Sequence, residues 1–94
     1  MTARPQRTVV VTGGARGIGR AVCTALAAPE TRLYFNYVSD RGGEKTAAAV
    51  QAAGGTASAA RVDVSDAAQV ADFFKRILDE SGRIDVLEIG RAHV

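Results

Sequence analysis

A glycine-rich stretch near the beginning of this sequence is the one best suited to bind a ligand. The stretch Thr12–Gly19 follows three consecutive valines and carries Gly13, Gly17 and Gly19. Glycine permits positive φ angles and lets the backbone approach a ligand closely. The N–H groups in the first turn of a following helix then favour an anion. The pattern predicts a loop that binds the pyrophosphate of a dinucleotide, and the alternative is a tight turn without a ligand.

A strand and a helix must position this loop. The valines at 9–11 show no polar alternation, which is typical of a parallel strand buried on both faces, here expected over 8–12. Apolar residues then recur at i, i+4, i+7 and i+8 and predict a helix over 18–28 that Pro29 ends. The apolar stripe of that helix is expected to comprise Ile18, Val22, Ala25 and Leu26.

The remaining sequence repeats the alternation of strand and helix. Strands are expected over 32–37, over 56–62 and from Ile84, with helices over 42–53 and from Ser65 to Gly82. Ser39 and Asp40 are expected to cap the second helix, and Ser65 the third. This order predicts an α/β fold of one domain (1–94), a doubly wound, Rossmann-like parallel sheet. Four strands in the order 3-2-1-4 and three helices would form it.

Composition narrows the classes of function. The 94 residues carry a net charge of +2 and no run that alternates basic and aromatic residues, which argues against a nucleic-acid interface. Cys23 is the only cysteine, so no internal disulfide forms, and we expect a small buried side chain there. Without a secretion signal or an apolar run of about 20 residues, the sequence predicts a cytoplasmic protein without a membrane partner.

The glycine pattern Thr12-Gly13-x-x-x-Gly17-Ile18-Gly19 resembles the TGxxxGIG fingerprint of the short-chain dehydrogenase/reductase family. It is most similar to the bacterial 3-oxoacyl-[acyl-carrier-protein] reductase type. The resemblance implies an oxidoreductase that reduces a carbonyl, such as a 3-oxoacyl thioester, by hydride transfer from a nicotinamide cofactor.

Two later segments extend the resemblance over about residues 8–87. Asp63 and Val64 look like the family's Asp-Val pair that contacts the adenine ring, and 82–87 looks like its lead into the fourth strand. An aspartate at such a position can also serve only as a turn or cap residue, and this alternative stays open.

The end of the second strand bears on the choice between NAD and NADP. An acidic residue there would bind the ribose 2′-hydroxyl and repel a 2′-phosphate, but Tyr37 occupies the expected position. The segment Asn36-Tyr37-x-Ser39 resembles NADP-type members of the family.

A basic residue in the glycine loop points the same way. Arg16, which precedes the second motif glycine, could pair with a 2′-phosphate. Val38 stands where NADP-type members often have a second arginine, and Asp40 is close by, which both favour NAD. NADP(H) is the predicted cofactor and NAD the less favoured one.

The family's catalytic residues have no counterpart in this sequence. The family uses a serine, a tyrosine and a lysine four residues after the tyrosine, whereas Tyr34 precedes Val38 and Tyr37 precedes Arg41 at that spacing. No Cys/His cluster offers a metal site. We therefore predict no catalytic and no metal-ligating residues.

The last residues depart from the family. Residues 88–94 read Glu-Ile-Gly-Arg-Ala-His-Val where the family continues with Asn-Asn-Ala-Gly. We therefore expect a chain truncated relative to the family, with a tail unlike the family that foreign sequence would explain. An inactive dinucleotide-binding portion is the first interpretation.

Two other interpretations stay open. A homo-oligomer could form through an exposed sheet edge, as a non-catalytic folded module with an empty or weak nucleotide site. A flavodoxin-like domain would share the fold, but the sequence lacks its acidic cluster. The predicted cofactor-binding residues are Gly13, Arg16, Gly17, Ile18, Gly19, Tyr37, Ser39, Asp63 and Val64.

Overall fold

Strands and helices alternate along the chain, as the sequence predicts. The computed structural model describes residues 7–14, 17–38 and 42–89. The elements in chain order are β1 (Arg7–Thr12), α1 (Gly17–Leu26), β2 (Thr31–Tyr37), α2 (Gly43–Ala52), β3 (Thr56–Arg61), α3 (Ala67–Ser81) and β4 (Val86–Ile89).

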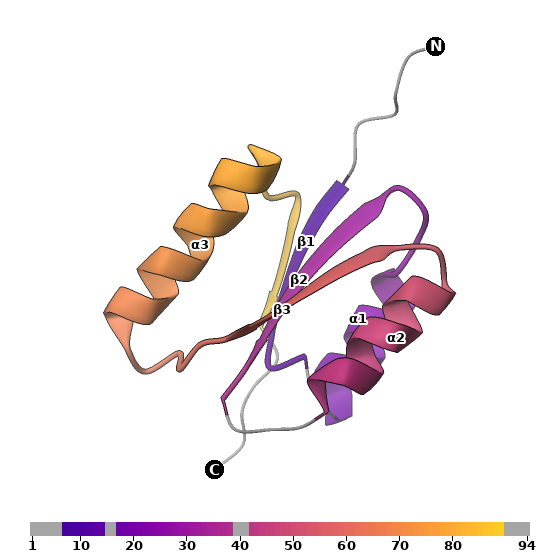
Figure 1. Cartoon of the computed structure of the whole chain (residues 1–94), viewed down its shortest axis with the longest axis horizontal. Helices are drawn as coiled ribbons and strands as arrows, with labels where there is room; N and C mark the ends of the chain where they lie inside the picture. Colours follow the sequence, from indigo (N-terminus) through magenta and orange to yellow (C-terminus); the bar gives the residue numbers. More distant parts are fainter. Residues whose placement is uncertain (1–6, 15–16, 39–41, 90–94) are drawn as a thin grey trace.

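The sheet has the predicted parallel topology. Its strand order is β3-β2-β1-β4, with Val9 in register with Leu33 on one side and with Val86 on the other. Helices α1 and α2 cover one face of the sheet and α3 covers the other (Figure 1). The doubly wound α/β fold is therefore confirmed, and all four strands end at the same edge of the sheet.

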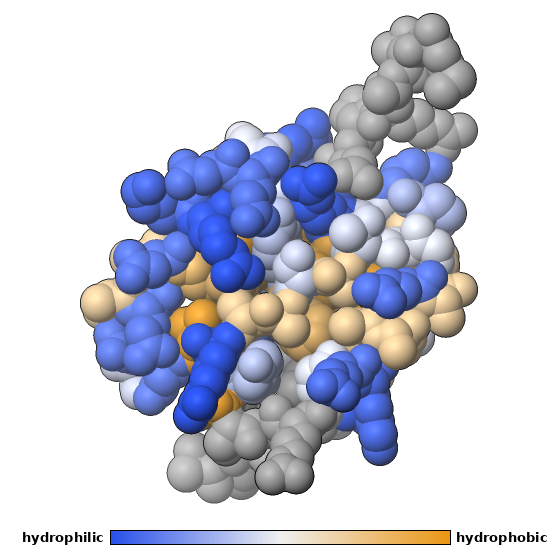
Figure 2. All heavy atoms as spheres, in the orientation of Figure 1, coloured by the Kyte–Doolittle hydropathy of each residue, from blue (hydrophilic) through white to orange (hydrophobic). Residues whose placement is uncertain are grey.

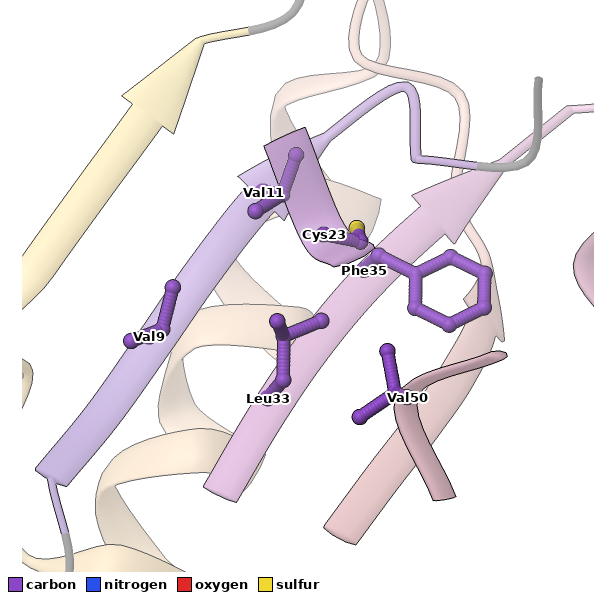
Figure 3. Close-up of a cluster of buried hydrophobic side chains, with 6 residues drawn as sticks. All are labelled: Val9, Val11, Cys23, Leu33, Phe35 and Val50. Atoms are coloured by element: carbon purple, nitrogen blue, oxygen red, sulfur yellow. The ribbon is translucent and has the colours of Figure 1, made fainter. Parts of the chain in front are cut away.

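The α1–α2 face buries a cluster of six side chains. Alternate residues of β1 and β2 point into this layer and meet one side chain from each helix (Figure 3). The Cys23 side chain is fully buried, as predicted, and this burial raises the pKa of its thiol to about 12. The cluster consists of Val9, Val11, Cys23, Leu33, Phe35 and Val50.

The α3 face combines apolar packing with one buried hydroxyl. Phe73 and Ile77 of α3 pack on Val10 and Tyr34. The Tyr34 hydroxyl lies 2.9 Å from Glu80 Oε1, to which it donates, and 2.9 Å from Ser81 Oγ. In the space-filling view, strongly hydrophobic residues are visible beside α3 (Figure 2). The end of α3 is thus held on β2 by polar contacts.

The expected apolar stripe of α1 is wrong at two positions. The Ile18 side chain is 81% exposed and Ala25 is exposed, whereas Gly19 and Cys23 are the buried residues of this helix. Helical periodicity defines the spacing of a buried stripe but not which of two neighbouring stripes faces the sheet. Close packing of the small residues at 19 and 23 places the stripe one position further along.

The expected cap of α3 is also displaced by one residue. Asp66 is the N-cap, and its Oδ1 accepts hydrogen bonds from the backbone N–H groups of Ala68 (3.0 Å) and Gln69 (3.2 Å). Ser65 instead bonds to Asp63. Serine and aspartate are both good N-caps. Because Ser65 is bonded in the turn to Asp63, Asp66 caps the helix instead.

The second helix and the fourth strand begin differently from the expectation. Helix α2 has Gly42 as its N-cap, without a side-chain hydrogen bond, and the expected caps Ser39 and Asp40 lie outside the described residues. Strand β4 begins at Val86, because Ile84 packs against the α3-side core before the strand pairs.

Polar contacts fix β4 against the beginning of β1. The Asp85 N–H donates to Thr8 O (2.9 Å), and the Thr8 N–H donates to Asp85 Oδ2 (2.7 Å). The Arg83 guanidinium also bonds to the Asp85 carboxylate. The hydrogen bonds from Arg83 and Thr8 favour the charged form and lower the pKa of Asp85.

None of the helices within 7–14, 17–38 and 42–89 has the length and hydropathy needed to cross a bilayer.

Candidate functional site

The candidate site lies where β1, β2 and β3 end. Asn36, at the end of β2, connects all three strand ends through its side chain. Its Oδ1 accepts the Gly13 N–H at 2.8 Å, and its Nδ2 donates to Val62 O at 2.9 Å. The glycine loop after β1 and the Asp63 turn after β3 are therefore joined across β2.

The glycine loop turns sharply into α1. Gly13 and Gly17 have φ angles of 72° and 59°, in the left-handed region that disfavours side chains. A Cβ atom on Gly19 would lie 1.9 Å from Gly13 O, so the beginning of α1 touches the backbone of the loop. The turn therefore needs Gly13 and Gly17 for their backbone conformation, and it needs Gly19 because a side chain there has no space.

Gly14 also has no room for a side chain. A Cβ atom there would lie 2.6 Å from Phe35 Cβ and 2.9 Å from Cys23 Sγ. The loop therefore rests directly on the buried core of the α1–α2 face. The fingerprint treats residue 14 as variable, so the sequence prediction omitted this glycine.

The outer side of the loop is open. Apart from its chain neighbours and the backbone of α1, no atom of the described residues lies within 4 Å of the position that a Cβ atom on Gly17 would take. The first N–H groups of a helix have no partner inside the helix and carry the positive end of its dipole, so the start of α1 suits a phosphate. The residues present therefore fit a dinucleotide pyrophosphate at Gly17, Ile18 and Gly19.

The exposed Ile18 side chain belongs to this open side. The prediction of Ile18 as a core residue is wrong, and the side chain lies exposed in the first turn of α1.

Asp63 and Val64 follow β3, with β2 between them and the glycine loop. Ser65 donates its hydroxyl (2.7 Å) and its N–H (2.9 Å) to Asp63 Oδ1, and both bonds lower the pKa of Asp63. Val64 is half exposed. The aspartate thus has the turn role that the sequence left open, and its second carboxylate oxygen is not used in that turn.

The residues expected at the ribose are only partly described. Tyr37 is half-buried, and its ring lies 3.7 Å from the position of a Cβ atom on Gly43, at the beginning of α2. Arg16 and Ser39 lie outside the described residues. The ring of Tyr37 therefore borders the gap between β2 and α2.

Thr46 is a polar residue of the site that sequence reasoning missed. Its hydroxyl, on α2, donates to Gly14 O at 2.8 Å and is fully buried. The signal available in the sequence was a threonine among alanines in a short helix, which by itself indicates nothing. In the described ranges, no group of three His, Cys, Asp or Glu side chains could hold a metal ion.

Comparison with known proteins agrees with this geometry. The sequence model of the short chain dehydrogenase family matches residues 7–92. A 3-oxoacyl-[acyl-carrier-protein] reductase from Synechocystis sp. is 40% identical over 88 residues, which are 93% of this chain and 36% of that protein. A short-chain dehydrogenase/reductase homologue from Bacillus subtilis is 37% identical over 82 residues, 86% of this chain and 75% of that protein.

A solved structure shares the fold. A metagenomic short-chain oxidoreductase in complex with NADP superposes with a TM-score of 0.84 at 32% identity, covering 94% of this chain and 39% of that one. The chain spans about a third of the length of the first curated relatives that it matches.

Proposed function

Because the chain belongs to the short-chain dehydrogenase family, we propose that it is the NADP(H)-binding portion of an oxidoreductase that reduces a carbonyl group. It corresponds to the N-terminal portion of the family's members. The observation that carries the proposal is the contact between Gly19 and the Gly13 carbonyl, with open space outside Gly17. A loop so tightly closed on its inner side, and open at a helix N-terminus, is built for an anionic ligand.

Seven of the predicted residues are assigned contacts with the cofactor. The first turn of α1 binds the pyrophosphate, and Asp63 and Val64 contact the adenine. Arg16 and Ser39 contact the 2′-phosphate. When bound, the nicotinamide supplies the hydride, and the protein orients it.

NADP is the favoured cofactor for two reasons. No acidic side chain stands at residue 37, where one would repel a 2′-phosphate. One solved relative carries NADP. The similarity to a 3-oxoacyl-[acyl-carrier-protein] reductase supports a 3-oxoacyl thioester as the substrate class of the oxidoreductase. The single buried cysteine fits the cytoplasm, where thiols stay reduced.

The chain itself is proposed to bind without turnover. Neither tyrosine has a lysine four residues later. Incubation with NADPH and an acetoacetyl thioester should therefore leave the absorbance of the reduced nicotinamide unchanged. Oxidation of NADPH that depends on the chain would contradict this part of the proposal.

Titration with 2′-phospho-AMP and AMP tests the site and the cofactor preference together. We expect tighter binding of 2′-phospho-AMP, with NMR shifts in the amides of 17–19. Arg16→Ala should remove the preference, a change of about tenfold or more, because a hydrogen bond to a charged group contributes about 1.5–3 kcal/mol. Lys75→Ala, a charge removed from the exposed face of α3, is the matched control. Unchanged spectra with both ligands would overturn the proposal.

A second candidate function rests on the edge of β4. This strand pairs with β1 alone among the described strands, and Leu87 (49% exposed) and Ile89 (70% exposed) leave apolar surface beside the edge. Such an edge invites pairing with another chain, so we propose a homo-oligomer formed through β4. Sedimentation velocity should show a dimer at high concentration that Ile89→Lys returns to the monomer. A monomeric wild-type chain at every concentration would exclude it.

A further inference from the structure

Two buried polar side chains form hydrogen bonds to the glycine loop from the interior of the protein. Asn36 is 2% exposed and Thr46 is 0% exposed, and neither belongs to the loop. Burying polar groups costs free energy unless each finds a partner. The partners that these two side chains find are backbone groups of the loop.

The Asn36 amide has one orientation that satisfies its neighbours. Its Oδ1 must accept from the Gly13 N–H, and its Nδ2 must donate to Val62 O. The backbone of the same residue accepts the Gly14 N–H at 3.2 Å. Residue 36 therefore takes up the N–H groups of both Gly13 and Gly14 and leaves neither for a phosphate.

Thr46 holds the carbonyl of the loop in the same way. Its hydroxyl donates to Gly14 O (2.8 Å) and accepts from Arg20 Nε (3.1 Å). Arg20 also donates from Nη2 to Gly42 O (3.3 Å), at the N-cap of α2. The two helices of this face and the loop are thus linked through one hydroxyl.

We propose that Asn36 is a positioning residue, which sets the glycine loop at a fixed distance from the adenine end of the site without touching the nucleotide. Its two bonds join the loop, where the pyrophosphate lies, to the end of β3, which leads directly to Asp63. With Gly13 and Gly14 bonded inward, only the N–H groups further along the loop can turn to the anion. Thr46 supports the same position from α2.

This inference rests on the proposed function for the identity of the ligand, whereas the geometry of the loop is observed without any ligand. Amide hydrogen exchange of Gly13 and Gly14 reports the loop without any ligand, so the two can fail separately. Protected amides in a wild-type chain that binds no AMP would contradict the proposed function alone. Unprotected amides at both glycines would overturn the positioning role.

The variant Asn36→Asp makes the positioning role depend on pH. A carboxylate at this place accepts from Gly13 but repels Val62 O, whereas the protonated acid can donate to Val62 O as the amide does. Burial raises the pKa of such a carboxyl. We expect AMP to bind about tenfold more weakly than to wild type at pH 8, with much of the loss recovered at pH 5.

Other ionisable groups do not produce this recovery. The charged side chains along the bonded elements are Asp63, whose pKa is lowered, and Arg20, which donates to Thr46 Oγ1. Because the AMP phosphate titrates near pH 6, affinities are compared as ratios to wild type at each pH.

Three further variants keep the test valid where Asn36→Asp folds poorly. Thr46→Val removes the hydroxyl at constant shape and should weaken AMP binding and expose the Gly14 amide, whereas Thr46→Ser should retain both. Tyr34→Phe removes a hydroxyl that bonds to the end of α3, on the other face of the sheet, and serves as the control for stability alone. The positioning role would be overturned if Tyr34→Phe lost as much AMP affinity as Thr46→Val and Asn36→Asp. It would also be overturned if the AMP affinity of Asn36→Asp relative to wild type did not change with pH.

Discussion

Replacement of Gly19 by alanine is expected to abolish nucleotide binding. The new Cβ atom would lie 1.9 Å from Gly13 O and 2.7 Å from Gly13 C, distances that no side-chain adjustment can relieve because both atoms are backbone. The loop would have to separate from the first turn of α1, which removes the arrangement that holds the anion. Calorimetric titration with 2′-phospho-AMP should show no measurable heat of binding.

Gly17→Ala is the matched control for this effect. Its Cβ atom would meet no atom of the described residues outside its chain neighbours and the backbone of α1, so the φ of +59° is the main obstacle to the substitution. That strain costs about 1–2 kcal/mol, which should lower the urea midpoint without disrupting the loop. If Gly19→Ala bound 2′-phospho-AMP as wild type does, the close contact would not define the site.

The second large effect is expected for Phe35→Ala. The Phe35 side chain is fully buried between Gly14, Cys23 and Val50. Its removal should cost about 3–5 kcal/mol, a large share of the roughly 5–15 kcal/mol that stabilises a domain of this size. Urea unfolding followed by circular dichroism should show a midpoint far below that of wild type.

Phe74→Ala provides the comparison on the other face. Phe74 is half-buried and packs edge-to-face on Phe73, with ring centroids 5.6 Å apart. Its loss should shift the midpoint much less. Equal shifts for the two variants would mean that the α1–α2 face does not dominate the stability.

The arrangement of the sheet could be predicted from local patterns. Consecutive valines in β1, glycines after the helices and the alternation of elements are sufficient, because a parallel sheet with right-handed crossovers allows few topologies. The details that failed are those that neighbouring groups decide. Ile18 faces outward because Gly19 and Cys23 pack more closely on β1 and β2, and Asp66 caps α3 because Ser65 is bonded to Asp63.

The site could be predicted only in the part that is continuous in the sequence. The fingerprint marks Gly13, Gly17 and Gly19, and the structure gives a physical reason for each. Asn36 and Thr46 act on a loop more than twenty residues away, so no spacing rule indicates their partners. Their roles follow only from the side-by-side placement of the ends of β1, β2 and β3.

The strand order has a consequence for how the chain is assembled during synthesis. Strand β1 lies between β2 and β4, but β4 is the last of the described elements to be made, and the Thr8–Asp85 bond closes 77 residues of chain. Closing a loop of that length costs only about 1 kcal/mol more free energy than closing the roughly 24 residues between β1 and β2. The two strand pairings therefore differ mainly in when they can form during synthesis. At about 5–20 residues per second, the central strand has an open side for several seconds, until a nascent chain has been extended past Val86.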